Sequence, residues 1–120
     1  MQHKILVICQ NPSLLPEIKS SLEQTACEIH SADSFHQAVS LISRFHYVMI
    51  IMDLDFSEAS GVAVLRKLRQ LHQTPILVLS GHATRAEEIE SLREGADYYL
   101  PIEKPPDTER CLTYAMSGKR

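Results

Sequence analysis

The chain has 120 residues, the size of one ordinary domain and long enough to bury a hydrophobic core. Hydrophobic residues make up 44% and charged residues 22%, as in typical globular proteins. The formal net charge of −3 gives no electrostatic basis for binding nucleic acid or a membrane surface, and no apolar run has membrane-spanning length. Three distant cysteines, Cys9, Cys27 and Cys111, indicate a reducing compartment, so we expect a cytoplasmic protein.

Apolar runs of strand length alternate along the chain with segments that repeat apolar residues at helical spacing. In chain order, the predicted strands are Lys4–Cys9, Glu28–Ser31, Tyr47–Met52, Pro75–Ser80 and Tyr98–Ile102. The predicted helices are Pro12–Thr25, 34–45, Gly61–Leu71, one that begins at Thr84, and Asp107–Met116. Five β–α units predict a single α/β domain over residues 1–117, with 118–120 as the start of a linker.

Two of the predicted helices begin with a capping box, in which two side chains satisfy the first backbone N–H groups. Ser34 and Gln37 form one pair, and Thr84 and Glu87 form the other. The helix that Thr84 opens is mostly charged, so little of it is expected to be buried. The residues expected on its buried side are Ala86, Ile89 and Leu92.

The order of the strands in the sheet follows from their composition. The first, third and fourth are continuous apolar runs, which need cover on both faces and therefore belong in the centre. Glu28–Ser31 alternates, and Tyr98–Ile102 contains Pro101, which cannot donate a ladder hydrogen bond, so both belong at edges. With right-handed crossovers these constraints favour a parallel sheet in the order 2-1-3-4-5. A ligand site is then expected at the carboxyl ends of strands one and three, where Asp53 stands.

Characteristic residues occupy the ends of three predicted strands. Asp53 ends the third strand with Gly61 eight residues later, Ser80-Gly81 ends the fourth, and "GADYYL" (95–100) enters the fifth. Together with "GVAVLRKLRQ" and "ESLREGADYYL", this pattern resembles the receiver domain of two-component response regulators, most closely the OmpR/PhoB type. The resemblance covers essentially the whole chain. It implies the flavodoxin-like (CheY-like) fold, a three-layer αβα sandwich, and a signalling protein that is not an enzyme.

The resemblance also implies a role for each matching residue. Asp53 corresponds to the phosphoacceptor, which takes a phosphoryl group from a sensor histidine kinase. A carboxylate is a competent nucleophile for this step when it is held in line with the donor. Ser80 and Tyr99 correspond to the switch residues, a hydroxyl that turns to the new phosphoryl oxygen and an aromatic ring that then repacks. Gly81 and Lys104 correspond to positions that contact the phosphate.

The resemblance also implies which surface of the domain passes the signal on. Asp97 matches the face formed by the fourth helix, the fifth strand and the fifth helix, through which this subfamily forms homodimers. Receivers of this type usually precede a DNA-binding domain, so we expect control of transcription through a C-terminal output domain that these residues do not include. We expect the receiver itself to contact neither nucleic acid nor a membrane.

The metal site departs from the family pattern. Receivers end the first strand with an acidic pair that binds Mg²⁺, and here "ILVICQNP" places Cys9 and Gln10 at those positions. Magnesium prefers carboxylate oxygens, and a thiol and a neutral amide are poor substitutes. The metal ligands are then Asp53 and Asp55 at most, unless Glu58 also supplies a carboxylate. A metal-dependent phosphoryl transfer is therefore in doubt.

The phosphate-binding lysine is displaced too. The family spacing Tyr-x-x-Lys-Pro, counted from Tyr99, puts Ile102 at the lysine position. The sequence "YYLPIEKPP" instead reads as though two residues precede Lys104-Pro105. Lys104 can reach the site if this loop bulges, and otherwise it points to solvent.

Three hypotheses about function stay open. The first is a receiver phosphorylated at Asp53, and the second is a pseudo-receiver that serves only as a protein-interaction or dimerisation module. The third, a small flavodoxin-like ligand binder or enzyme, is weakest, because "CQNPSLLP" after the first strand has no glycine to cradle a phosphate. The residues that favour the first are Asp53, Ser80 and Tyr99, and those that favour the second are Cys9, Gln10 and Ile102. We expect any phosphorylation to be slow or weakly coupled.

Overall fold

The computed structural model describes residues 2–55 and 60–102 of the chain. Its strands are β1 (Lys4–Ile8), β2 (Glu28–Ala32), β3 (Met49–Asp53), β4 (Ile76–Ser80) and β5 (Tyr98–Pro101). Its helices are α1 (Leu14–Ser21), the short 3₁₀ helix η1 (Glu23–Thr25), α2 (Phe35–Arg44), α3 (Gly61–Leu71) and α4 (Arg85–Arg93). The predicted helix Asp107–Met116 and the predicted linker lie outside the described residues.

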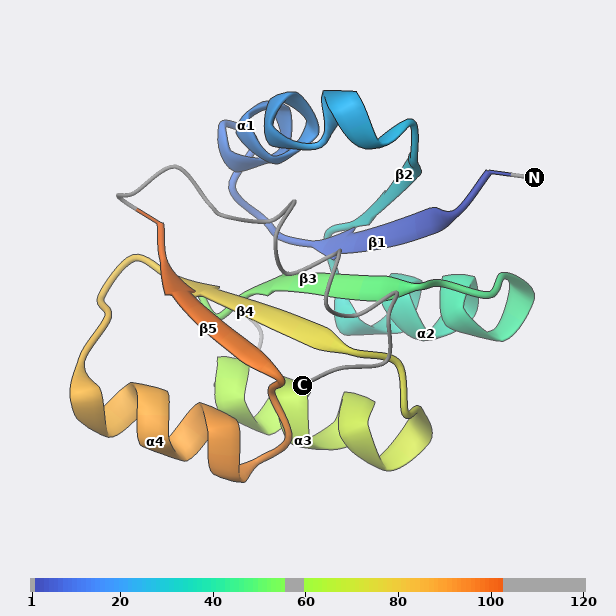
Figure 1. Ribbon diagram of the computed structural model, residues 1–120. Helices are drawn as coiled ribbons and strands as arrows, with labels where there is room; N and C mark the ends of the chain where they lie inside the picture. Colours follow the sequence, from blue (N-terminus) through green and yellow to red (C-terminus); the bar gives the residue numbers. More distant parts are fainter. Residues whose placement is uncertain (1, 56–59, 103–120) are drawn as a thin grey trace.

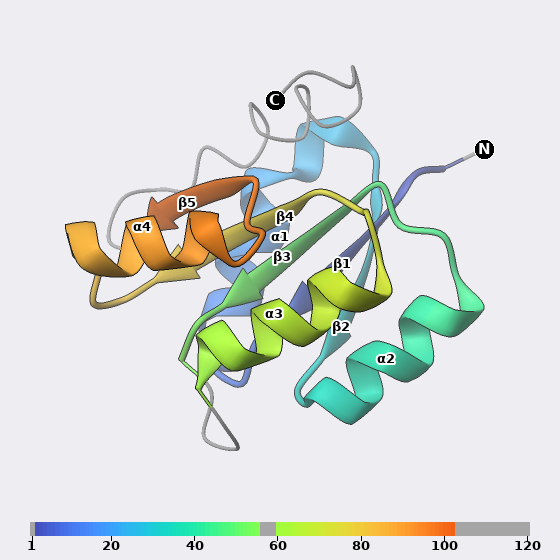
Figure 2. The same ribbon diagram turned by 90° about the horizontal axis from the view of Figure 1, so that it is seen from below.

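The strands form one parallel sheet in the order β2-β1-β3-β4-β5, which confirms the predicted order. One face is covered by α1, and the other by α2, α3 and α4 (Figure 1; Figure 2). The architecture is therefore the predicted flavodoxin-like αβα sandwich. None of the helices in the described part of the chain could cross a membrane, since each is too short or too polar.

The burial of the strands explains their order. Every residue of β3 and β4 is buried, whereas β5 is half-buried along its length and β2 has only one buried residue, Ala32. The two strands predicted to be edges are thus the edges. Pro101 pairs with Ser80 at the end of β5, where a missing N–H donor is tolerated.

The hydrophobic core forms two layers, one on each face of the sheet. Successive side chains of a strand point to opposite faces, so Ile50 and Met52 of β3 belong to one layer and Met49 and Ile51 to the other. The residues that α2 and α3 contribute to the first layer are Ala38, Ile42, Val64, Leu65 and Leu68. Those that the α1 region contributes to the second are Leu14, Ile18 and Leu22.

The predicted helix Pro12–Thr25 is shorter than expected and divides into α1 and η1. The hydroxyls of Ser21 and Thr25 each donate to a carbonyl oxygen three residues earlier, Ile18 O at 2.8 Å and Leu22 O at 2.6 Å. Such bonds compete with the regular helical ladder. The segment ends at Ala26, whose φ of 57° lies in the left-handed region.

The prediction for the buried side of α4 is wrong. Ala86 is exposed, Ile89 is 45% exposed and Leu92 is 44% exposed, while Ser91 is fully buried. The helix turns a small residue toward the sheet, and the carbonyl of Ser91 accepts a hydrogen bond from the N–H of Ala96 at 3.0 Å. Two large apolar side chains of α4 are therefore left on the surface.

Candidate functional site

Asp53 is the last residue of β3, and its side chain is only 3% exposed at the carboxyl edge of the sheet. Met52 pairs with Ile8 at the end of β1, and Asp53 itself pairs with Leu79 of β4. The chain leaves β1 toward β2 on one side and leaves β3 toward β4 on the other (Figure 1). Asp53 therefore stands at the topological switch point, where α/β sheets bind ligands.

Within the described part of the chain, the carboxylate of Asp53 is held through one oxygen. Its Oδ1 accepts a hydrogen bond from the N–H of Asp55 at 3.0 Å, and no other described residue hydrogen bonds to it. Burial raises the pKa of Asp53; the hydrogen bond from Asp55 lowers it, and the charge of Asp55 raises it again. Oδ1 is therefore fixed in place, while Oδ2 has no hydrogen bond to any of the residues that the structure describes.

Gly61 accounts for the eight-residue spacing from Asp53. A Cβ atom at this position would lie 2.1 Å from the backbone oxygen of Leu54, closer than atoms can approach. Only glycine allows the first turn of α3 to rest on the residue that follows Asp53.

Cys9 follows β1 directly, and its side chain is 8% exposed within the core layer on the α1 face. Burial raises the pKa of the Cys9 thiol, and the charge of Asp53 raises it further. The next residue, Gln10, turns its Nε2 to the backbone oxygen of Asp33 at 3.0 Å. Cys9 is thus a protonated, apolar neighbour of Asp53, and Gln10 is tied to the loop between β2 and α2.

Ser80 and Tyr99 are brought together by a third residue. Ser80 ends β4 at 3% exposure; its hydroxyl donates a short hydrogen bond to Oε1 of Glu87 and accepts one from the N–H of His82 at 3.2 Å. The hydroxyl of Tyr99 donates to the same Oε1 at 2.6 Å. Burial raises the pKa of Tyr99 and the hydrogen bond to Glu87 adds to that effect, while the nearby hydroxyl of Ser80 opposes it. Both predicted switch residues therefore share one carboxylate oxygen.

From the sequence, Glu87 is expected only as a member of a capping box with Thr84. Half of that box is present, because Oγ1 of Thr84 accepts a hydrogen bond from the N–H of Glu87 at 3.1 Å. The side chain of Glu87 points to the sheet instead of to the start of its own helix. Glu87 follows Ser80 by seven residues and lies in the first turn of α4. This spacing was the sequence signal available for the contact.

Ile102 fills the position at which the resemblance puts a lysine. Its N–H donates to the backbone oxygen of Ser80 at 2.9 Å, and its side chain packs against the core layer on the α1 face. Its Cδ1 lies 3.9 Å from where a Cβ on Gly81 would be. An apolar group therefore lies beside Gly81. The predicted phosphate-contacting residue Lys104 lies outside the described residues.

Asp97, which the resemblance places on the dimer face, has a side chain that is 7% exposed and turned inward. Its Oδ2 accepts hydrogen bonds from Nη2 of Arg69 at 2.8 Å and from the N–H of Ile76 at 2.9 Å. Arg69 also donates to the backbone oxygen of Gly95 at 2.8 Å. Asp97 therefore joins α3, β4 and the start of β5, and its part in dimerisation stays a prediction.

Residues 5–115 match the family of response regulator receiver domains. The chain belongs to this family. Among its relatives is the transcriptional regulatory protein SrrA of Staphylococcus aureus, which is 32% identical over 100 residues, 83% of this chain and 42% of SrrA. The chain thus spans less than half the length of this curated relative.

Solved structures of receivers agree with this assignment. A receiver domain from Clostridium thermocellum has a TM-score of 0.84 and 25% identity, over 97% of this chain and 95% of that one. A response regulator from Burkholderia pseudomallei, with a phosphorylated aspartic acid and a calcium ion, has a TM-score of 0.79 and 28% identity, over 98% and 71% of the two chains. This chain is therefore the receiver domain of a two-component response regulator, homologous to a transcriptional regulator, and a signalling module rather than an enzyme.

The described side chains around Asp53 do not fit the Mg²⁺ site that the family implies. Cys9 offers a protonated thiol, and the amide of Gln10 is engaged with Asp33. In residues 2–55 and 60–102, no three His, Cys, Asp or Glu side chains are grouped to hold a metal ion. Neither Cys9 nor Gln10 offers a carboxylate oxygen, the ligand that Mg²⁺ prefers.

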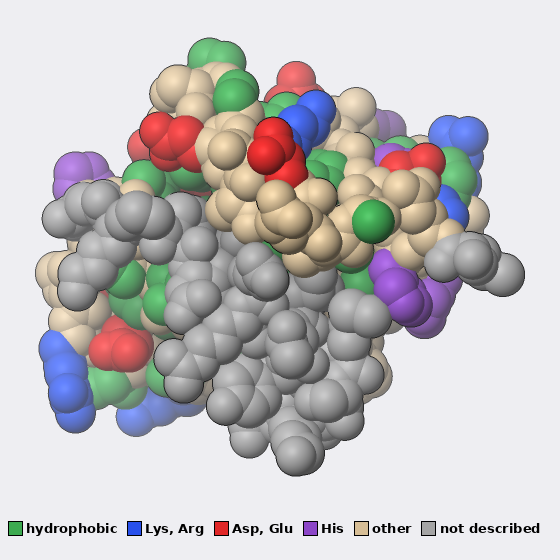
Figure 3. All heavy atoms as spheres, turned by 45° about the horizontal axis from the view of Figure 1, so that its top comes forward, with side chains coloured by type: hydrophobic (Ala, Val, Ile, Leu, Met, Phe, Trp, Pro, Cys, Tyr) green, Lys and Arg blue, Asp and Glu red, His purple; other side chains and the backbone are tan. Residues whose placement is uncertain are grey.

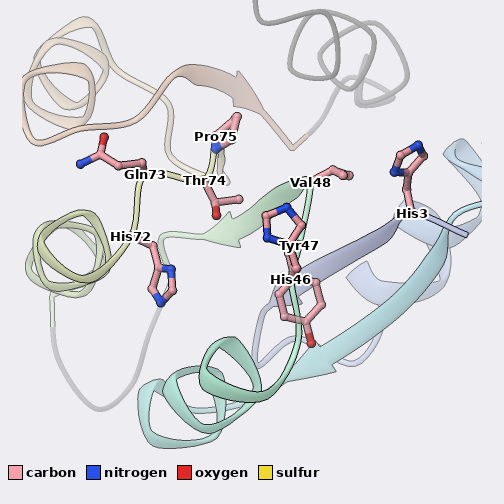
Figure 4. A pocket seen from close by; sticks show the side chains of 8 residues that line it. All are labelled: His3, His46, Tyr47, Val48, His72, Gln73, Thr74 and Pro75. Atoms are coloured by element: carbon pink, nitrogen blue, oxygen red, sulfur yellow. The ribbon is translucent and has the colours of Figure 1, made fainter. Parts of the chain in front are cut away.

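A cavity of about 520 Å³ lies elsewhere on the receiver, at the amino ends of β1, β3 and β4 (Figure 4). His3, His46 and His72 line it from three separate segments, and none of its lining residues is acidic. It lies at the opposite edge of the sheet from Asp53. Among the coloured, described residues in Figure 3, acidic and basic side chains are interspersed. Neither feature belongs to the site at Asp53.

Proposed function

We propose that this receiver is phosphorylated at Asp53 by a sensor histidine kinase, and that its α4–β5 face changes its association in response. The observation that carries the proposal is the position of Asp53, with Oδ1 held by Asp55 and Oδ2 unbonded among the described residues. The phosphorylated aspartic acid of the Burkholderia relative supports the same chemistry.

In the proposed step, Oδ2 of Asp53 attacks the phosphorus atom of a phosphohistidine. A P–O bond forms, the P–N bond breaks, and the departing imidazole nitrogen keeps the electron pair and takes a proton. The product is an acyl phosphate that carries about two negative charges. Cys9 and Ile102 supply no charge to offset them, so we expect the step to be slow compared with receivers that have a complete metal site.

Mass spectrometry of the intact protein tests this proposal. Incubation with Mg²⁺ and a small phosphodonor such as acetyl phosphate is expected to add one phosphoryl group, and Asp53→Asn is expected to abolish the addition. Glu23→Gln is the matched control, because Glu23 is an exposed acidic residue in η1 and has no part in the site at Asp53. No addition to the wild type, or equal addition to Asp53→Asn, would contradict the proposal.

A pseudo-receiver is the second candidate, and the environment of Asp53 favours it. A buried thiol, an amide tied to Asp33 and an apolar Ile102 surround a site that binds metal and phosphate in other receivers. In that case the fold serves only to bind a partner or a second copy of the chain. The phosphorylation experiment separates the two candidates directly.

A homodimer through the α4–β5 face also forms part of the proposal. Ile89 and Leu92 lie exposed on α4, which is otherwise mostly charged. Exposed apolar side chains grouped on one helix are typical of an interaction surface. We further propose that the full-length protein controls transcription through an output domain, as the similarity to SrrA suggests.

A further inference from the structure

One oxygen of Glu87 receives both switch hydroxyls. Oε1 accepts from Oγ of Ser80 and, at 2.6 Å, from the hydroxyl of Tyr99. Hydrogen bonds to a carboxylate are stronger than those between neutral groups, and this one is partly shielded from water. Glu87 therefore fixes the orientation of two side chains at once.

Each hydroxyl has only one proton to donate. The proton of Ser80 is engaged with Glu87, while its oxygen accepts from the N–H of His82. A phosphoryl oxygen on Asp53 accepts hydrogen bonds and donates none, so Ser80 can bond to it only by leaving Glu87. The two contacts exclude one another.

Glu87 also connects this exchange of the Ser80 hydrogen bond to α4. Its N–H donates to the N-cap residue Thr84, which places the carboxylate on the first turn of the helix. The exposed Ile89 and Leu92 follow within the next turn and a half. A change in the hydrogen bonds of Oε1 therefore acts directly on the first turn of the helix that carries these apolar side chains.

We propose that Glu87 is a positioning residue that holds Ser80 and Tyr99 in the unphosphorylated arrangement and transmits the loss of the Ser80 contact to α4. This inference rests on the proposed function, since it describes how phosphorylation at Asp53 is coupled to the α4–β5 face. It gives Glu87 a role beyond the capping of its own helix.

Beryllofluoride, which mimics the phosphoryl group, provides the test in the 120-residue chain. Glu87→Gln keeps the shape of the side chain but removes its charge, so Ser80 is released more easily. We expect beryllofluoride to bind Glu87→Gln about fivefold to tenfold more tightly than wild type, the difference between a charge-assisted and a neutral hydrogen bond. The effect should vanish when Ser80 is also replaced by Ala.

Glu88→Gln is the matched control, because Glu88 is also an acidic residue in the first turn of α4 and its loss alters the helix terminus equally. An equal effect of Glu88→Gln, or a gain that persists with Ser80→Ala, would overturn the proposal. So would a Glu87→Gln variant whose affinity matches the wild type.

A second readout does not depend on phosphorylation. Burial raises the pKa of Tyr99 most, and the hydrogen bond to Glu87 raises it further. Glu87→Gln should therefore lower that pKa part of the way toward its ordinary value of 10.0, measured by NMR of the tyrosine ring. Glu88→Gln should leave it unchanged. If wild type binds no beryllofluoride but Tyr99 responds as expected, the proposed function fails and the positioning role of Glu87 stands. An unchanged Tyr99 pKa in Glu87→Gln overturns the positioning role.

Discussion

At the scale of single residues, Asp53 combines burial with one fixed oxygen, and both properties have measurable consequences. Burial favours the neutral form of the side chain in the folded protein, which raises its pKa above the unfolded value. Ionised Asp53 therefore lowers the free energy of unfolding. This penalty is absent at a pH below the unfolded pKa and appears as the pH rises through the folded pKa.

Asp53→Asn is accordingly expected to stabilise the domain at pH 7 by roughly 1 kcal/mol. Asparagine can still accept the hydrogen bond from the N–H of Asp55, so the loop contact is kept. The gain should disappear near pH 3, when Asp53 is protonated. Urea unfolding at the two pH values checks this, with the exposed Asp33→Asn as the control. An equal gain at both pH values would show that charge burial is not the cause.

Gln10 is the simplest place to test the metal site. Gln10→Asp returns a carboxylate to the carboxyl end of β1, and we expect it to strengthen Mg²⁺ binding about tenfold or more. NMR shifts of the amides around Asp53 during a Mg²⁺ titration measure the affinity. Gln73→Asp, at the opposite edge of the sheet, should have no effect. Strong binding by the wild type would instead mean that Asp55 or Glu58 replaces the missing ligands.

At the scale of elements, Arg69 and Asp97 join α3 to β4 and β5 in a largely buried contact. The two side chains are 19% and 7% exposed, and Arg69 also donates to the carbonyl oxygens of His72 and Thr74, each at 3.1 Å. Gly95 completes the contact, because its φ of 119° and the nearness of Arg69 leave no room for a Cβ atom. The order of β4 and β5 therefore depends on polar contacts as well as on apolar packing.

Asp97→Ala should destabilise the domain by about 2–3 kcal/mol, because it leaves Arg69 and the N–H of Ile76 without this partner. Thermal or urea unfolding measures the loss. Glu94→Gln, which breaks the exposed pair with Arg66, should have little effect by comparison. Similar losses in both variants would rule out a special role for the buried contact.

The exposed apolar residues of α4 lead to a prediction about assembly. Replacement of Ile89 by Glu should leave the fold intact, since the side chain is 45% exposed, but should weaken a homodimer at least tenfold. Sedimentation measurements over a range of concentrations give the dimer affinity. Leu71→Glu is the control, because Leu71 is 54% exposed on α3, outside the α4–β5 face. A dimer that tolerates Ile89→Glu would have to use another surface.

At the scale of the whole molecule, the periodicity of the strands was enough to predict the sheet. Continuous apolar runs are buried on both faces, and Pro101 marks an edge, so the strand order follows from local sequence. The buried side of α4 could not be predicted in this way. A short, charged helix is placed by a few specific contacts, here those of Glu87 and Ser91, and its apolar residues do not indicate which side faces the sheet.

In the candidate site, the residues that lie on strands could be predicted from the sequence, because the strands themselves could. Asp53 and Ser80 end β3 and β4, and Tyr99 lies within β5, so the register of the strands determines where these residues lie. Glu87 reaches them from a helix, and Asp97 turns inward to Arg69, 28 residues earlier; both depend on how separate elements pack. The positions of Asp53, Ser80 and Tyr99 along the strands could therefore be predicted from the sequence, but the contact of Glu87 with Ser80 and Tyr99 could not.

The central claim is that a phosphoryl group on Asp53 is communicated to α4 through Ser80 and Glu87. NMR of the amides, with and without beryllofluoride, tests it most directly. We predict shifts near Asp53 and Ser80 together with shifts along α4 up to Ile89 and Leu92, and loss of the α4 shifts alone in Ser80→Ala. Shifts confined to the surroundings of Asp53, with α4 unchanged in the wild type, would contradict the claim.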